Sequence, residues 1–208
     1  MKFIVTISAI VAACGLAASS VAAAGADGAP WDYASPAQWG SCQVKANKAQ
    51  YDLLQFHVHA PSEHTLNGEP LDGEVHFVHS NADGSALLVV GVFMEIDPSG
   101  NTDPWLEAVI DGIDDVSSTK PAMLDLTSVS ALIRKSVGHG TLYNYPGSLT
   151  TPGCDEIVDW WVVEKPMRIS AKDLTRIREN QGEIKMNYKN ENSRPVQALN
   201  DRTIQSFK

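Results

Sequence analysis

Three histidines are the residues of this chain whose types and spacing point most directly to chemistry. His57 and His59 lie in the segment 55–59 (QFHVH), and His76 lies in the segment 74–79 (EVHFVH). Residues two apart in a β-strand project from the same face, so His57 and His59 point together, and a neighbouring antiparallel strand would bring His76 beside them. Three neutral imidazoles with an open fourth position are the ligand set of a catalytic zinc ion, which binds and acidifies a water molecule. The spacing therefore predicts a zinc site.

Each of these segments also carries a polar residue that shares a face with its histidines. Gln55 lies on the face of the first two histidines, and Glu74 lies on the face of His76. A histidine ligand almost always donates its second ring nitrogen to such a partner, so we expect Gln55 and Glu74 to orient the ligands. His79 falls on the opposite face and His64 falls outside the pattern, so both are expected to be structural.

Two threonines in a loop bounded by proline and glycine form a second candidate group. Thr150 and Thr151 lie in the segment 145–154 (YPGSLTTPGC), which on its own indicates only a turn. A threonine hydroxyl both donates and accepts a hydrogen bond, so Thr150 could orient a zinc hydroxide if a carboxylate fixed its proton. We expect Glu63 to be that carboxylate.

A β-sheet is the element that must position these side chains. Alternating or continuously apolar patterns predict strands at 51–59, 73–80, 85–96 and 157–164. The segment 86–96 is nearly all apolar, which is typical of a central strand buried on both faces. Helical spacing with capping residues predicts short helices that begin after Asp103 and after Ser170. The pattern indicates a mainly β fold of the α+β class, with an antiparallel sheet and peripheral helices in one domain.

Composition and the start of the chain narrow the class of protein. With 208 residues and 43% hydrophobic residues, the chain can bury one sizeable core. The formal net charge of −9 argues against nucleic acid or an anionic membrane as a partner. Residues 1–24 carry an early Lys2, an apolar run and small residues at 21–24, which is typical of a secretory signal peptide. We therefore expect a secreted protein without a membrane span and with a single domain at 25–208; the oligomeric state is left open.

Two cysteines remain once the predicted signal peptide, with its Cys14, is removed. In an exported protein, Cys42 and Cys154 are most simply joined in a disulfide. Two unpaired buried thiols are the alternative.

Several further motifs stand in the same order as in one known family. They are the segment 62–65 (SEHT), the tail segments 194–197 (RPVQ) and 199–202 (LNDR), and an N-terminal arm with Trp31, Tyr33 and Trp39. Together with the histidine and threonine segments, they closely resemble the α-class carbonic anhydrases from about Trp31 to Lys208. The resemblance implies a twisted, mostly antiparallel central sheet with short peripheral helices. It also implies zinc-dependent, reversible hydration of carbon dioxide to bicarbonate and a proton through zinc-bound hydroxide.

The resemblance assigns roles to individual residues. His57, His59 and His76 are similar to the family's zinc ligands, and Gln55 and Glu74 fall on the partners of those ligands. Thr150 is similar to the threonine that accepts a hydrogen bond from the hydroxide and donates one to Glu63, and Thr151 lies where bicarbonate binds. Cys42 and Cys154 match a disulfide common in secreted members. The hydrophobic wall that holds carbon dioxide corresponds to Val78, Val89, Leu149 and Trp160.

The chain departs from the family between Trp39 and Tyr51, where it has only eleven residues. The family has several strands there, with a Ser-Pro-Ile/Val motif and an Asn-Gly-His segment that supplies the usual proton-shuttle histidine. We therefore expect some N-terminal strands to be missing, one edge of the sheet to be exposed, and the proton to leave through buffer or another residue.

Three other interpretations stay open at this point. The chain could be a carbonic-anhydrase-like binding, storage or matrix protein with weak or no catalysis, which the missing segment favours. It could also be a shortened splice or gene-model form. A cupin is the third, because His57-x-His59-x-x-x-Glu63 fits that metal motif. Tyr51 disfavours it, since the motif has glycine there.

Overall fold

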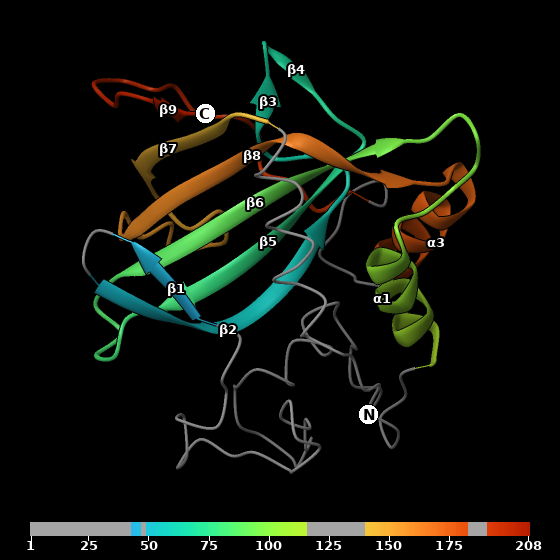
Figure 1. Ribbon diagram of the computed structural model, residues 1–208, viewed down its shortest axis with the longest axis horizontal. Coiled ribbons are helices and arrows are strands. Elements are labelled where there is room, and N and C mark those ends of the chain that lie inside the picture. Colours follow the sequence, from blue (N-terminus) through green and yellow to red (C-terminus); the bar gives the residue numbers. More distant parts are fainter. Residues whose placement is uncertain (1–42, 47–48, 116–139, 183–190) are drawn as a thin grey trace.

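The computed structural model describes residues 43–46, 49–115, 140–182 and 191–208, and within them most strands join one mixed sheet (Figure 1). The spatial order of this sheet is β1-β2-β5-β6-β8-β7-β9. Its strands are β1 (Gln43–Ala46), β2 (Ala49–His59), β5 (Gly73–Ser80), β6 (Leu87–Ile96), β7 (Leu142–Gly147), β8 (Val158–Ile169) and β9 (Gln205–Phe207). A small separate ribbon and the helices are β3 (Thr65–Leu66), β4 (Glu69–Pro70), α1 (Pro104–Asp115) and α3 (Ala171–Gly182).

Neighbouring strands of the large sheet are antiparallel, with β6 and β8 as the parallel exception. A parallel pair needs a crossover connection, and the chain between these strands includes α1 and β7. The mainly β fold with a mostly antiparallel sheet and short peripheral helices is therefore confirmed. The parallel pair places the loop after β7 at the same end of the sheet as the start of β6.

The predicted strands and both predicted helices are present, several strand ends differ by one or two residues, and two differences are larger. β8 continues past 164 to Ile169, and its register against β6 shifts between Val92 and Met94, which accommodates Pro166. β7 includes Tyr145-Pro146-Gly147, which the sequence pattern assigned to a loop. β9 pairs with residues 142–144 of β7 and does not reach Pro146. On the β9 side of this strand, the missing N–H of Pro146 therefore leaves no hydrogen bond unmade.

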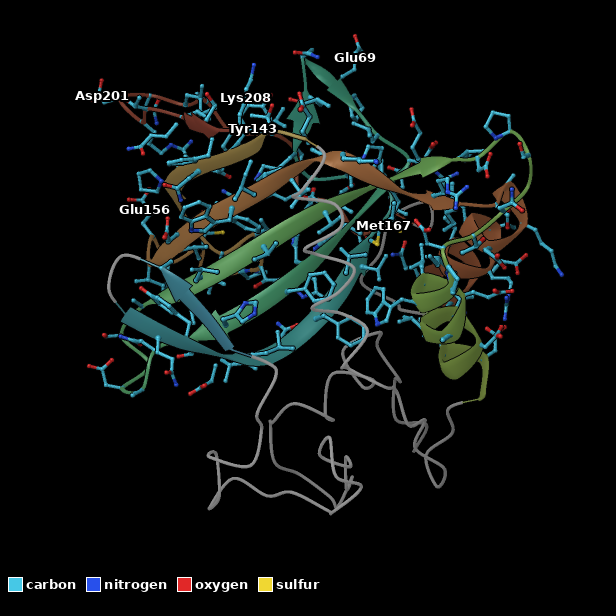
Figure 2. The ribbon with its side chains drawn as sticks, viewed as in Figure 1. Glu69, Tyr143, Glu156, Met167, Asp201 and Lys208 are labelled. Carbon is cyan, nitrogen blue, oxygen red and sulfur yellow. The ribbon has the colours of Figure 1, made fainter. Side chains whose placement is uncertain are left out.

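The two faces of the sheet bury different kinds of side chain. On one face, Phe56 and Phe77 pack against Trp105 of α1, with ring centroids 5.5 Å apart in both pairs. Leu174 of α3 joins the same cluster, and Met167 of β8, labelled in Figure 2, lies where the sheet meets the helices. The opposite face carries the histidines and a smaller apolar cluster. The helices therefore support the sheet from behind the candidate site.

Part of the sequence-based expectations falls on residues outside the described ranges. These are the signal peptide 1–24, the aromatic arm and Cys42. No helix in the described ranges is long and apolar enough to cross a membrane.

Candidate metal site

The strands β2 and β5 bring His57, His59 and His76 together. The two strands are antiparallel neighbours, and His57 lies directly opposite His76 in their register. The ring centroids are 4.9 Å apart for His57 and His59, 5.2 Å for His57 and His76, and 4.7 Å for His59 and His76. One ring nitrogen from each histidine lies within 4.8 Å of the others. The arrangement matches the one that the strand spacing predicts.

Hydrogen bonds decide which ring nitrogens of His57 and His59 remain available. His57 Nδ1 donates to Gln55 Oε1 at 2.7 Å, and His59 Nδ1 donates to the backbone carbonyl of Asn192 at 3.1 Å. Both bonds fix the Nδ1–H tautomer and leave Nε2 with its lone pair. His59 Nε2 is buried and accepts no hydrogen bond within the described structure. Two Nε2 atoms are therefore free to bind a metal.

Glu74 orients His76 from a fully buried position. Its Oε1 lies 3.1 Å from His76 Nε2 and accepts a hydrogen bond from His64 Nδ1 at 2.7 Å. Its Oε2 accepts the backbone N–H groups of Glu63 and His64, both at 3.0 Å. Burial by itself would raise the pKa of Glu74, but the nearby His64 and His76 outweigh it and hold this pKa well below its usual range. Because this carboxylate faces Nε2 of His76, the other ring nitrogen, Nδ1, is the one left to bind a metal.

His64 has a structural place in this network, as the sequence pattern predicts. Its Nε2 pairs with the hydroxyl of Tyr145 at 2.7 Å, while its Nδ1 is bound to Glu74. Burial lowers the pKa of His64, but the charge of Glu74 and its hydrogen bond more than compensate, so the net shift is upward. The ring thereby links β7 to the carboxylate behind His76.

His79 faces away from the site. It is buried, and its Nδ1 donates to the backbone carbonyls of Phe77 at 2.9 Å and Leu88 at 3.2 Å. This is the placement expected from its position three residues after His76.

Burial keeps His57 and His59 neutral. Desolvation, followed by the charge of His76, lowers the pKa of His57 well below its usual value and lowers the pKa of His59 to about 4. Neutral imidazoles are the form that binds a metal. The donor set is thus three imidazole nitrogens on a rigid sheet, which fits zinc in both ligand type and number.

Gly91 of β6 provides the space that this network needs. It lies opposite His76 in the sheet, and a Cβ there would come within 2.5 Å of Glu74 Oε1 and 3.7 Å of His76 Cδ2. Any larger residue would displace the carboxylate. The sequence pattern gave no signal for this glycine, because the contact exists only once β5 and β6 are paired.

Glu63 is a buried carboxylate with one oxygen turned to the histidines. Its Oε1 accepts the backbone N–H of Arg194 at 2.7 Å, and its Oε2 lies 3.4 Å from His59 Nε2. Thr150 lines the same cavity as Glu63, but no hydrogen bond joins them in the described structure. Thr151 lies exposed in the same loop, and its carbonyl accepts the Cys154 N–H at 2.9 Å.

The residues assigned to a hydrophobic wall form one cluster beside the histidines. Val78, Val89 and Trp160 are buried, and Leu149 is half-buried against them. The Trp160 ring lies 4.7 Å from the His76 ring, centroid to centroid. An apolar surface therefore borders the three free nitrogens.

Cys154 is a half-buried thiol whose Sγ contacts the carbonyl of Thr151 at 3.3 Å. It has no disulfide partner among the described residues, and Cys42 lies outside them. The Cys42–Cys154 disulfide stays a prediction.

Sequence reasoning missed Asn192 and Arg194, which join the site from the C-terminal segment. Asn192 lies 133 residues after His59, and its neighbourhood has neither a strand pattern nor a capping signal. Only the folded chain brings these residues to β2.

The fold and the site define a protein with a mixed β-sheet that presents three histidines from adjacent strands, the half-buried His57 and the buried His59 and His76. Residues 31–208 match the family model of the eukaryotic-type carbonic anhydrases, so the chain belongs to this family, and the resemblance drawn from its motifs is confirmed.

Individual relatives agree with this assignment. The chain is 36% identical to carbonic anhydrase Nec1 of Nesocodon mauritianus over 169 residues, which are 78% of this chain and 57% of that protein. It is 32% identical to dioscorin DB3L of Dioscorea polystachya over 158 residues, which are 76% of this chain and 55% of that one. The chain thus spans little more than half the length of these curated relatives.

A solved structure shows the same architecture. The α-carbonic anhydrase from Thermovibrio ammonificans, in complex with sulfanilamide, superposes with a TM-score of 0.61 at 36% identity and covers 78% of this chain and 66% of that one. The structure of dioscorin complexed with ascorbate superposes with a TM-score of 0.60 at 26% identity, covering 80% of this chain and 66% of that one.

Proposed function

We propose that this protein binds one zinc ion through His57, His59 and His76 and catalyses the reversible hydration of carbon dioxide to bicarbonate and a proton. The observation that carries the proposal is the convergence of three ring nitrogens within 4.8 Å. The other ring nitrogen is hydrogen-bonded in His57 and His59, and in His76 it faces Glu74 Oε1 at 3.1 Å. Family membership supports the reaction.

A zinc ion bound by three neutral imidazoles keeps its full charge and lowers the pKa of a bound water to about 7. The chain's own contribution is to fix the donors. Gln55, Asn192 and Glu74 each hold one histidine by its second nitrogen, so the tautomers and ring directions are set before the metal arrives. Burial keeps the rings of His57 and His59 unprotonated at neutral pH.

Glu63 and Thr150 are proposed to orient the attacking oxygen. The Arg194 N–H holds Glu63 in place, and the carboxylate is an acceptor only. In the proposed geometry the Thr150 hydroxyl donates a hydrogen bond to Glu63, so its oxygen lone pair faces the nucleophile and accepts a hydrogen bond from it. This arrangement points the nucleophile's remaining lone pair at the carbon. Thr151 is proposed to contact the bicarbonate product.

The apolar cluster is proposed to hold carbon dioxide next to the nucleophile. Val78, Val89, Leu149 and Trp160 offer no polar group that would compete for the metal. A nonpolar gas gains from such a surface, whereas water does not. The proton leaves to buffer in this proposal, because the segment that carries the family's shuttle histidine is missing between Trp39 and Tyr51.

The experiment that tests the proposal is stopped-flow hydration of carbon dioxide by the full chain, before and after zinc removal, with metal content measured in parallel. We expect a zinc-dependent rate that rises with buffer concentration.

His59→Ala should lose both zinc and activity. Thr150→Ala should keep zinc and lose about 100-fold in rate, as for the loss of one preorganised hydrogen-bonding group. Thr175→Ala, which removes an exposed hydroxyl on α3, is the matched control.

A carbonic-anhydrase-like binding protein without turnover is the second candidate function. The observation that favours it is length, since the chain spans 55% to 58% of its curated relatives. A folded, zinc-loaded sample that hydrates no carbon dioxide would establish this alternative.

We also propose that residues 1–24 direct export; a cell fractionation with and without these residues tests that step.

A further inference from the structure

A cavity of about 360 Å³ lies beside the candidate metal site, between the C-terminal segment 191–208 and the loop that follows β7. Glu63 and Thr150 form part of its wall, but none of the three ligand histidines lines it. Its volume is within the range of pockets that hold small organic molecules. The proposed reaction uses the wall with Glu63, Thr150 and Trp160 and gives the side formed by the C-terminal segment no role.

Two arginines of the C-terminal segment line the cavity. Arg202 is fixed in place, because its Nε donates to the carbonyl of Leu199 at 2.9 Å and its Nη2 to that of Ala198 at 2.5 Å. Its Cζ lies 5.7 Å from the centre of the Tyr145 ring. Throughout the described ranges, no carboxylate lies within 4.0 Å of the guanidinium of Arg194 or Arg202. In an acidic chain, two such cations at one cavity favour an anionic ligand.

Glu63 restricts where an anion can sit. Its carboxylate lines the cavity and would repel a second carboxylate, but its Oε2 is turned to His59 Nε2 at 3.4 Å. Its Oε1 is bound to the backbone N–H of Arg194. An anionic group is therefore accommodated on the side of the arginine side chains, away from the wall shared with the metal site.

The cavity is also bordered by exposed aliphatic side chains. Val196, Leu199 and Ile204 are 63%, 47% and 46% exposed, and all three line the cavity, with the buried Trp160 as another wall. Figure 2 shows Lys208 of the same segment beside Tyr143 of β7, and Asp201 farther out at the edge of the molecule. Exposed aliphatic groups gathered around a pocket mark a surface that binds an apolar body.

We propose that this cavity binds a small organic carboxylate. Its carboxylate pairs with Arg194 and Arg202, and its apolar body packs between Trp160 and the exposed aliphatic side chains. An uncharged ligand would leave the arginines unpaired, and an inorganic anion such as bicarbonate would leave the aliphatic border exposed.

Titration of the full chain with benzoate tests the proposal. The protein is first stripped of metal with a chelator, so that anion binding to zinc contributes nothing, and binding is followed by ligand-observed NMR. We expect a dissociation constant on the order of 1 mM for so small a ligand. Benzyl alcohol, which lacks the charge, and acetate, which lacks the ring, should each bind at least about ten-fold more weakly.

Two variants locate the ligand. Arg194→Gln should weaken benzoate binding at least about ten-fold through loss of a charge-assisted hydrogen bond. Val196→Asp should do the same by repulsion, and Val196 is exposed enough that its replacement leaves the fold intact. Arg168→Gln is the matched control, because Arg168 pairs with Asp97 and Asp103 outside the cavity and should leave binding unchanged.

Two results would overturn the proposal. One is the absence of benzoate binding to the metal-free protein. The other is benzoate binding to the metal-free protein that neither Arg194→Gln nor Val196→Asp weakens, which would place the ligand outside the cavity. Because the titration uses metal-free protein, its outcome is independent of whether the zinc-loaded protein hydrates carbon dioxide.

Discussion

Asn192 holds the backbone of β2 on both sides of a proposed zinc ligand. Its Nδ2 donates to the carbonyl of Val58 at 2.8 Å, and its Oδ1 accepts the N–H of Ala60 at 3.2 Å. These two bonds frame His59, whose Nδ1 donates to the Asn192 carbonyl. The side chain thus fixes the position of the carbonyl that orients the ligand.

Asn192→Ala should weaken zinc binding about 10- to 100-fold, the usual cost of losing a group that orients a ligand. The alanine keeps the carbonyl but removes both side-chain bonds, so His59 would no longer be held in one direction. Competition with a chromophoric chelator measures the affinity.

Asn180→Ala is the control for this prediction, since Asn180 only bonds the exposed Asp114 on the helical side of the molecule. Equal zinc affinity in the Asn192 variant and in the control would mean that the backbone of the C-terminal segment suffices to place the carbonyl.

At the scale of elements, α3 connects the helical layer to the ligand strand. Gln181 near its end is fully buried, and its Nε2 donates to the carbonyl of Val58 at 3.2 Å. The start of α3 is capped by Ser170, whose Oγ accepts the Asp173 N–H at 3.0 Å and donates to Asp173 Oδ2 at 2.8 Å. The cap and the contact to β2 therefore lie on the same helix.

Ser170→Ala should lower the free energy of unfolding by about 1 kcal/mol, because the first turn of α3 loses its capping hydroxyl. Urea denaturation measures the change. Ser99→Ala, in an exposed loop where the serine backbone N–H donates to Asp97 Oδ1 at 2.9 Å, should leave the stability within experimental error. A loss of the same size in both variants would contradict a specific role for the cap.

The sequence predicts the elements of this site better than it predicts the contacts between them. The local pattern shows that the histidines of β2 share one face and that His76 lies on the next strand. The pairing of β2 with β5 then places His57 opposite His76. Gly91 and Asn192 could not be found in this way, because their roles arise only where distant segments meet. β7 was missed because it ends in Pro146 and Gly147, a pair typical of a turn. The strand tolerates this proline because its pairing with β9 ends at Asn144.

For the whole molecule, zinc should act as a stabiliser as well as a cofactor. The three proposed ligands are assembled only when β2 and β5 pair, so the metal binds the folded state preferentially. At free zinc about 100-fold above the dissociation constant, unfolding should cost about 2.7 kcal/mol more than in the metal-free protein. Urea denaturation at several zinc concentrations measures this, and His59→Ala should abolish the dependence. A zinc effect of equal size in that variant would place the metal elsewhere.

The metal-free protein should lose stability as the pH falls from about 6.5 to 4. His79 is buried, and desolvation outweighs its backbone hydrogen bonds and the charge of Asp52 and lowers its pKa to about 4, while the same residue titrates near 6.5 when unfolded. Between these values the unfolded chain binds more protons than the folded chain, so acid favours unfolding. The same sign holds for His57 and His59, whose pKa values are also lowered, whereas the raised pKa of His64 acts in the opposite direction.

The share of His79 in this acid sensitivity can be measured by itself. A full shift from 6.5 to about 4 corresponds to about 3 kcal/mol at the acid end of the window. His79→Asn retains a side-chain N–H for the carbonyls of Phe77 and Leu88 but does not titrate. Urea denaturation of the metal-free protein from pH 7 to 4 should therefore show a shallower loss in this variant than in the unmodified chain. Identical pH profiles would mean that His79 becomes protonated without unfolding the sheet, and the acid response would then rest on the histidines of the metal site.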